Sequence, residues 1–201
     1  MNLPNALTVF RIALIPVFVA VFLTPFRGHE AVALAVFLAA ALTDLVDGLL
    51  ARLTGTTTEL GALLDPIADK LLVAASVVCL VGAGRIPSWV AAVVIGREIA
   101  VTGFRSMAAS KGVLIPAGWA GKVKMNLETY ALAFYILGPK ALGGWFVIGR
   151  VMLGSAVVLA VASAVEYFVK FGPAVLGKKL SEDEKPAGPS PANPSPRRSR
   201  R

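Results

Sequence analysis

The chain has 201 residues, of which 56% are hydrophobic and 16% are charged, and its net charge is +8 at pH 7. Typical soluble domains carry about 25% charged residues, so this composition argues against a water-soluble fold and predicts an integral membrane protein. The basic residues are scattered between apolar runs and the C-terminal end. That distribution argues against nucleic-acid binding and favours contact with the anionic headgroups of a lipid bilayer.

Six apolar segments follow one another, and each is long enough to cross a bilayer as a helix. They cover about 6–26, 31–53, 60–83, 87–109, 122–139 and 142–169. Ionisable residues interrupt them: Arg11, Asp44, Asp47, Asp65, Asp69, Arg97, Glu98, Glu128 and Arg150. A charge near the bilayer centre costs at least about 2.5–3.5 kcal/mol, so these side chains must face other helices or a wet cavity. The sequence therefore predicts an all-α, integral membrane bundle of six transmembrane helices.

Four single features complete this outline. The first segment lacks a convincing cleavage site after Phe26 and is expected to be a retained helix. The only cysteine, Cys79, cannot form an intramolecular disulfide and is predicted to be a small buried hydrophobe. The only histidine, His29, is expected in a solvated loop, and Arg150 is expected deep in the last helix without an assigned function.

The short loops predict the orientation of the chain. With the N-terminus inside, the inner segments hold Arg52, Arg105, Lys111, Lys122, Lys124 and the basic tail. The outer loops hold only Arg27, Arg85 and Lys140. This asymmetry predicts a multi-pass protein of the cell membrane with both termini in the cytoplasm. Residues 1–177 would form one membrane domain, and the basic segment 178–201, rich in proline and serine, would form a disordered tail.

Two pairs of aspartates carry the main chemical signal. Asp44 and Asp47 are three residues apart and share one helix face, while Asp65 and Asp69 are four apart and share a face of the next helix. The connection between the two helices is short and polar, so the helices are expected to be antiparallel neighbours. All four carboxylates would then converge near the cytoplasmic end of the pair. Buried partners for Arg or Lys could explain one or two aspartates, but not this spacing across two helices.

Four converging carboxylates repel one another unless a positive species neutralises them or they are protonated. No histidine or cysteine lies between Asp44 and Asp69, so the available ligands are hard oxygens. Such ligands favour Mg²⁺ or Mn²⁺ over Zn²⁺. Two such ions suit chemistry on a diphosphate, because they neutralise its charge.

The stretch from Asp44 to Asp69, with Gly48, Ala51, Arg52 and Gly61 at fixed positions between them, resembles the signature of the CDP-alcohol phosphotransferases. This resemblance implies a six-helix membrane domain that usually forms a homodimer, with a site open to the cytoplasm. It also implies transfer of the phosphatidyl group of CDP-diacylglycerol to an alcohol, with release of CMP.

The resemblance further implies a role for each matching position. Asp44, Asp47, Asp65 and Asp69 would bind the metal pair, with Asp69 also acting as general base on the acceptor hydroxyl. The CDP-lipid would be bound by Asn5, Gly48, Arg52 and Thr58.

Basic residues in the second half of the chain predict an anionic acceptor. Arg97 and Arg105 are eight residues apart, near two helical turns, and Lys122 follows on the next segment. These side chains would bind a phosphate, although positive-inside topology is the simpler alternative for each. The segments around them resemble those of bacterial phosphatidylglycerophosphate synthases, which implies glycerol 3-phosphate as acceptor. Met125 stands where threonine is usual in those proteins.

Several alternatives stay open at this point. The same site could serve inositol phosphate, phosphatidylglycerol (for cardiolipin) or serine. Glu98 and Glu128 could orient the basic residues or only pair with them. An ion or proton transporter would spread its charges along a path through both leaflets, whereas these cluster on one side. A non-catalytic scaffold gives no reason for the aspartate spacing.

Overall fold

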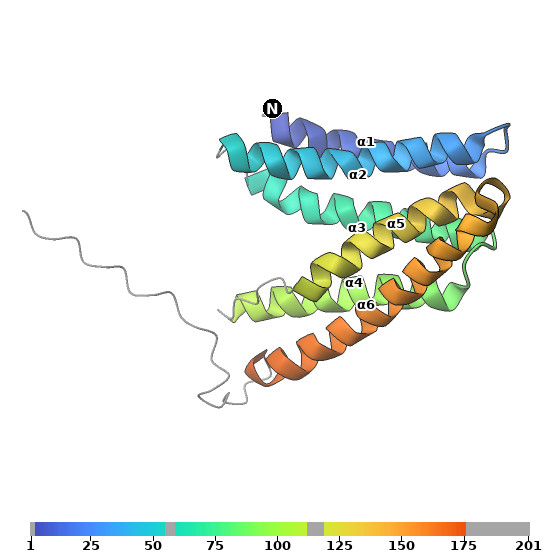
Figure 1. Cartoon of the computed structure of the whole chain (residues 1–201). Helices are drawn as coiled ribbons and strands as arrows, with labels where there is room; N and C mark the ends of the chain where they lie inside the picture. Colours follow the sequence, from blue (N-terminus) through green and yellow to red (C-terminus); the bar gives the residue numbers. More distant parts are fainter. Residues whose placement is uncertain (1–2, 55–58, 112–118, 176–201) are drawn as a thin grey trace, which may run out of the picture.

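The computed structural model describes residues 3–54, 59–111 and 119–175, with side chains for 7–43, 64, 66–111, 123 and 125–173. Within these ranges the protein is all-helical (Figure 1). The helices are α1 (Leu3–Leu23), α2 (His29–Thr54), α3 (Glu59–Gly82), α4 (Ser88–Ser110), α5 (Trp119–Leu142), the short 3₁₀-helix η1 (Gly143–Trp145) and α6 (Phe146–Val175).

Each of the six apolar segments predicted from the sequence forms one of the α-helices, so the all-α bundle is confirmed. In the part of the chain whose side chains are described, one helical stretch, Met125–Pro173, is long and apolar enough to cross a membrane. The apolar parts of α1 and α2, Leu7–Leu23 and His29–Thr43, are shorter. The count of six spans therefore stays a prediction, as does the tail, which lies outside the described residues.

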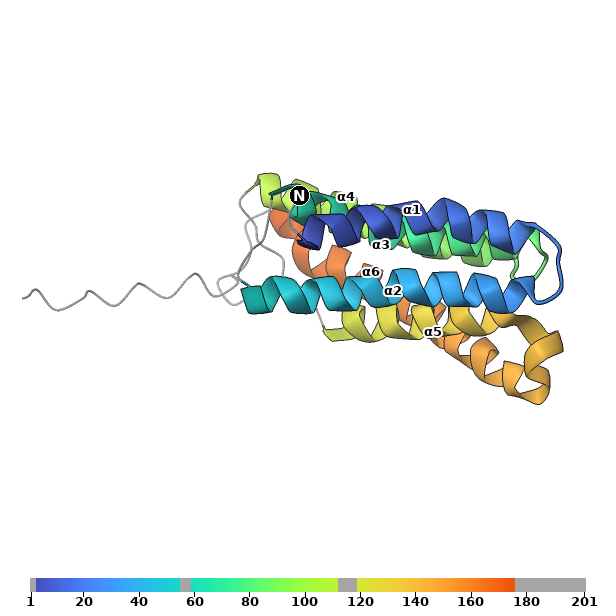
Figure 2. The ribbon, with the colours of Figure 1, turned by 90° about the horizontal axis from the view of Figure 1, so that it is seen from above.

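The bundle is assembled from neighbouring helices that run side by side. Contacts are most extensive between α5 and α6 and between α1 and α2, and α1 also packs on α3 (Figures 1 and 2). The close approach of α5 and α6 depends on Gly149, because a Cβ atom there would lie 2.5 Å from Cβ of Phe134. The helices α3 and α4 diverge from the connection that joins them (Figure 1).

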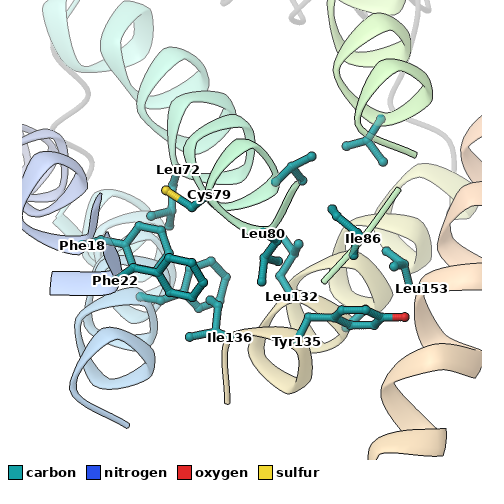
Figure 3. Packing of buried hydrophobic residues seen from close by; sticks show 14 of the residues in the cluster. Phe18, Phe22, Leu72, Cys79, Leu80, Ile86, Leu132, Tyr135, Ile136 and Leu153 are labelled. Carbon is teal, nitrogen blue, oxygen red and sulfur yellow. The ribbon is translucent and has the colours of Figure 1, made fainter. Parts of the chain in front are cut away.

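A continuous apolar core joins the helices (Figure 3). Phe18 and Phe22 of α1 stack with ring centroids 5.8 Å apart, and Phe37 of α2 lies 6.0 Å from Phe18. Leu80 and Ile136 bring α3 and α5 into the same cluster. Cys79 is 5% exposed within this core, so its prediction as a buried hydrophobe is confirmed.

One polar cluster holds the bundle together at the end where α3 joins α4. The guanidinium of Arg85 donates through Nη1 to the carbonyl oxygens of Tyr135 (2.9 Å) and Ile136 (2.6 Å), and through Nη2 to Glu30. Gly138 has φ +78° and interrupts α5, and Pro139 has no N–H to offer the Tyr135 carbonyl. Arg85 therefore supplies the missing donor, while its guanidinium also lies 5.4 Å from the Phe22 ring centroid. We call Arg85, Glu30 and these two carbonyls the Arg85 cluster.

Two minor predictions were wrong. Arg150 is the fifth residue of α6 and is exposed, about 6 Å from the start of that helix, so it does not lie deep in the bundle. His29 is half-buried at the first position of α2, with Nδ1 2.9 Å from the carbonyl oxygen of Phe26. It joins the loop to the helix instead of standing free in solvent.

Candidate active site

The two aspartate pairs occupy matching positions on consecutive helices. Asp44 lies ten residues before the end of α2 and Asp69 ten residues after the start of α3, so each is about 15 Å along its helix from the shared connection. By the same measure, Asp47 and Asp65 lie about 10 Å from it. The side chains of Asp44, Asp47 and Asp65 lie outside those described. The backbone nevertheless places the two pairs at equal depth at one end of the α2–α3 hairpin.

The positions predicted to bind the CDP-lipid belong to the same end of the bundle. Asn5 lies in the first turns of α1, and Gly48 and Arg52 lie in the last turns of α2. Figures 1 and 2 show the start of α1, the end of α2 and the start of α3 together at that end. The side chains of these three residues are not among those described, and Thr58 lies outside the described residues altogether.

Asp69 lines a cavity of about 150 Å³ that is enclosed by α1, α2, α3 and α5. Its carboxylate-bearing side chain is half-buried. The polar side chains that share the cavity are Arg11, Asn126, Thr129 and Tyr130. The apolar wall comes mainly from α2, with Phe37, Leu38, Ala40, Ala41 and Leu42. A general base at Asp69 would therefore have both polar and apolar side chains around it.

Arg11 was not among the predicted site residues, although its charge in an apolar run was noticed. It is 1% exposed and extends from α1 to the cavity that Asp69 lines. Arginine stays protonated in proteins, so Arg11 brings a positive charge to the cavity that Asp69 lines. The signal in the sequence is an arginine inside an apolar segment, because burying such a charge is costly unless it has a partner or a role.

The basic residues predicted to bind the acceptor differ in their surroundings. Arg97 is half-buried and lies at helical spacing from the buried residues Val94 and Val101 of α4. Its Nη1 donates to Oε1 of Glu98 (2.7 Å) and its Nη2 to Oγ of Ser163 on α6 (3.1 Å). The sequence left open whether Glu98 orients a basic residue or only pairs with it, and this ion pair is compatible with both alternatives.

Arg105 follows Arg97 two turns further along α4, but its side chain is exposed. Arg105 lies towards the end of α4 far from the α3–α4 connection, next to the cluster in which Ala108 is buried against Phe104, Tyr167 and Phe171. Lys122 lies in the first turn of α5, and its side chain is outside those described. Glu128, two turns into α5, is 2% exposed. The assignment of Arg97, Arg105 and Lys122 to the acceptor stays a prediction.

The donor set at the aspartates fits hard divalent cations. Among the side chains that the structure describes, no group of three or more His, Cys, Asp or Glu could hold a metal ion, and three of the four aspartates lie outside that set. The four residues offer only carboxylate oxygens, which Mg²⁺ and Mn²⁺ prefer. Their equal depth on α2 and α3 is the arrangement that a shared pair of cations would need.

Comparison with known proteins places the chain in a class of enzymes. The profile of the CDP-alcohol phosphatidyltransferase family matches residues 1–162, which include all four aspartates, and the chain belongs to this family. Members of this family generally depend on divalent metal ions. The family predicted from the stretch between Asp44 and Asp69 is therefore confirmed.

Curated relatives narrow the class further. The CDP-diacylglycerol–glycerol-3-phosphate 3-phosphatidyltransferase of Bacillus subtilis is 39% identical over 183 residues, covering 84% of this chain and 94% of its own. The enzyme of the same name from Pseudomonas fluorescens is 40% identical, covering 83% of this chain and 88% of its own. A probable phosphatidylglycerophosphate synthase of Mycobacterium tuberculosis is 38% identical, covering 84% and 81%.

Proposed function

We propose that this protein transfers the phosphatidyl group of CDP-diacylglycerol to sn-glycerol 3-phosphate, giving phosphatidylglycerophosphate and CMP. The observation that carries the chemistry is the equal depth of two aspartate pairs on α2 and α3, with Asp69 lining a cavity that it shares with Arg11 and Asn126. The choice of glycerol 3-phosphate rests on the names of relatives that are 38–43% identical to this chain.

The reaction requires one proton transfer and one exchange of bonds at phosphorus. The Asp69 carboxylate takes the proton of the acceptor hydroxyl, and the acceptor oxygen attacks the β-phosphorus of the CDP-lipid. The bond from that phosphorus to the CMP oxygen breaks, and CMP leaves with the electron pair. Two Mg²⁺ or Mn²⁺ ions, when held by Asp44, Asp47, Asp65 and Asp69, would neutralise the diphosphate.

Each half of the site then serves one substrate. Arg52 pairs with the diphosphate, Gly48 leaves space beside it, and Asn5 and Thr58 contact the nucleotide. Arg97, Arg105 and Lys122 hold the phosphate of the acceptor through charge-assisted hydrogen bonds. Arg11 contributes a fixed positive charge at the wall of the Asp69 cavity, which lowers the electrostatic cost of gathering phosphates and carboxylates there.

The proposal includes a place in the cell membrane, with six spans and both termini in the cytoplasm. Its support is the number of large apolar side chains on the outside of the bundle, among them Val151, Val158 and Val169 on α6. Trp89 and Trp145 are exposed at the end that would face outward, where a membrane interface favours tryptophan. The homodimer that the family resemblance implies is part of the same proposal.

The test uses purified protein in mixed micelles with CDP-diacylglycerol, Mg²⁺ and one acceptor at a time. We expect CMP release with glycerol 3-phosphate and little with inositol phosphate, phosphatidylglycerol or serine. The Asp69→Asn variant, purified in parallel, controls for contaminating enzymes. Strong CMP release with another acceptor and none with glycerol 3-phosphate would keep the family and overturn the proposed substrate.

A further inference from the structure

A serine on the last helix contacts the arginine assigned to the acceptor. Ser163 of α6 is 4% exposed, and its Oγ accepts a hydrogen bond from Nη2 of Arg97 at 3.1 Å. The two residues are 66 positions apart in the sequence, and neither the aspartate motif nor the basic residues point to α6. Ser163 is thus the described residue outside α4 that bonds to Arg97.

The direction of the Ser163 hydroxyl is fixed by its own helix. Oγ donates to the carbonyl oxygen of Ala160 at 3.0 Å. A serine hydroxyl has one hydrogen and two lone pairs, so the hydrogen is used within α6 and the lone pairs face Arg97. Because Ser163 is buried, water does not compete for this position. The hydroxyl therefore acts as a fixed acceptor.

Ser163 and Glu98 together hold the guanidinium while leaving part of it available. They take one N–H each from Nη2 and Nη1 of Arg97. Three of the five N–H groups of an arginine then remain, including the buried Nε–H, which has no hydrogen-bond partner among the described residues. The Nε and Nη groups form the fork with which arginine binds phosphate in two parallel hydrogen bonds.

Arg97 also lies at a depth suited to the acceptor. It is nine residues, about 14 Å, from the start of α4, whereas Asp69 is thirteen residues, about 20 Å, from the end of α3 at the same side of the bundle. The two levels differ by about one helical turn. A short alcohol with a phosphate at its other end is long enough to span this difference in depth.

We propose that Ser163 is a positioning residue that orients Arg97 toward the phosphate of the acceptor. The inference rests on the proposed function, since it takes Arg97 to bind that phosphate. Arginine has a flexible side chain, and a fixed acceptor reduces the number of rotamers that it samples before the substrate arrives. Removal of the Ser163 hydroxyl should therefore weaken acceptor binding without touching the reacting atoms.

The experiment compares four variants of the full chain: Ser163→Ala, Ser163→Thr, Ser155→Ala and Arg97→Ala. Ser155 lies on the same helix two turns away and serves as matched control. We expect Ser163→Ala to raise KM for glycerol 3-phosphate by about three- to tenfold, because one hydrogen bond to a charged group is lost. Its kcat and its KM for CDP-diacylglycerol should stay within about twofold of the starting protein. Ser163→Thr retains the hydroxyl and should restore KM.

The outcomes separate this inference from the function on which it rests. If Arg97→Ala raises KM for glycerol 3-phosphate and Ser163→Ala behaves like Ser155→Ala, Ser163 does not position Arg97. If Ser163→Ala changes both KM values alike and lowers the melting temperature, Ser163 only joins α4 to α6 and the inference is overturned. If Arg97→Ala leaves KM for glycerol 3-phosphate unchanged, the assignment of Arg97 to the acceptor is wrong, and the inference is overturned with it.

Discussion

The Arg85 cluster offers a quantitative test of what holds this bundle together. Replacing Arg85 by alanine removes two hydrogen bonds to the carbonyls of Tyr135 and Ile136 and the ion pair with Glu30. A hydrogen bond that involves a charged group contributes about 1.5–3 kcal/mol when it is well buried. The Arg85 and Glu30 side chains are 18% and 23% exposed, and water can enter the truncated site, so we expect a total loss of about 2–4 kcal/mol.

Thermal unfolding in detergent, followed by circular dichroism, measures this loss. By the scaling for chains of this size, Arg85→Ala should lower the melting temperature by roughly 5–15 °C. Arg27→Ala, which changes an exposed basic residue at the same end of the bundle, is the matched control. The kcat of the folded Arg85→Ala fraction should be unchanged, because the cluster lies about 20 Å along α3 from Asp69.

A double-mutant cycle with Glu30→Gln isolates the ion pair from the two carbonyl contacts. The reasoning fails if Arg85→Ala is no less stable than Arg27→Ala, because the Tyr135 carbonyl that Pro139 leaves without a helical donor would then bind water at no cost. It also fails if kcat falls in proportion to the melting temperature, since the cluster would then take part in catalysis.

Three further predictions concern the chemistry. Asp69→Asn should retain less than about a tenth of the activity, a barrier change above about 1.4 kcal/mol, while still binding CDP-lipid in part; higher CMP release would exclude Asp69 as the base. EDTA should abolish activity and Mg²⁺ or Mn²⁺ should restore it, because the donor set is all oxygen; full activity in chelator would contradict the metal site. Arg105→Ala should raise KM for glycerol 3-phosphate by about one to two orders of magnitude, and Arg52→Ala should instead raise KM for CDP-diacylglycerol. Equal effects on both substrates would remove the division of the site into two halves.

The sequence predicted the helices well because hydrophobicity and length determine them. Each apolar segment formed a helix, and the four aspartates lie within α2 and α3 as their helical spacing predicted. The family was predicted for a related reason, since the motif lies within two adjacent helices and depends on local spacing. Features that depend on neighbours within one or two turns are visible in a sequence.

Contacts between distant segments could not be predicted in this way. Arg85 looked like an ordinary loop charge, because nothing nearby shows that Pro139 leaves a carbonyl without a donor 50 residues further on. Ser163 looked like a small residue in an apolar helix until α4 was placed against α6. The charge of Arg11 within an apolar segment is visible in the sequence. Its position in the wall of the Asp69 cavity is not, because that position depends on the packing of four helices.

The burial of Cys79 makes the native protein suitable for labelling from either side of a membrane. The chain has one cysteine, and its sulfur lies in the apolar core, out of reach of water-soluble thiol reagents. Ser88 and Ser110 are exposed at opposite ends of α4. A single cysteine introduced at either position would therefore be labelled without a contribution from Cys79. In sealed vesicles, a thiol reagent that cannot cross the bilayer should label one of these positions and not the other. The position that is labelled shows which end of the bundle faces the cytoplasm.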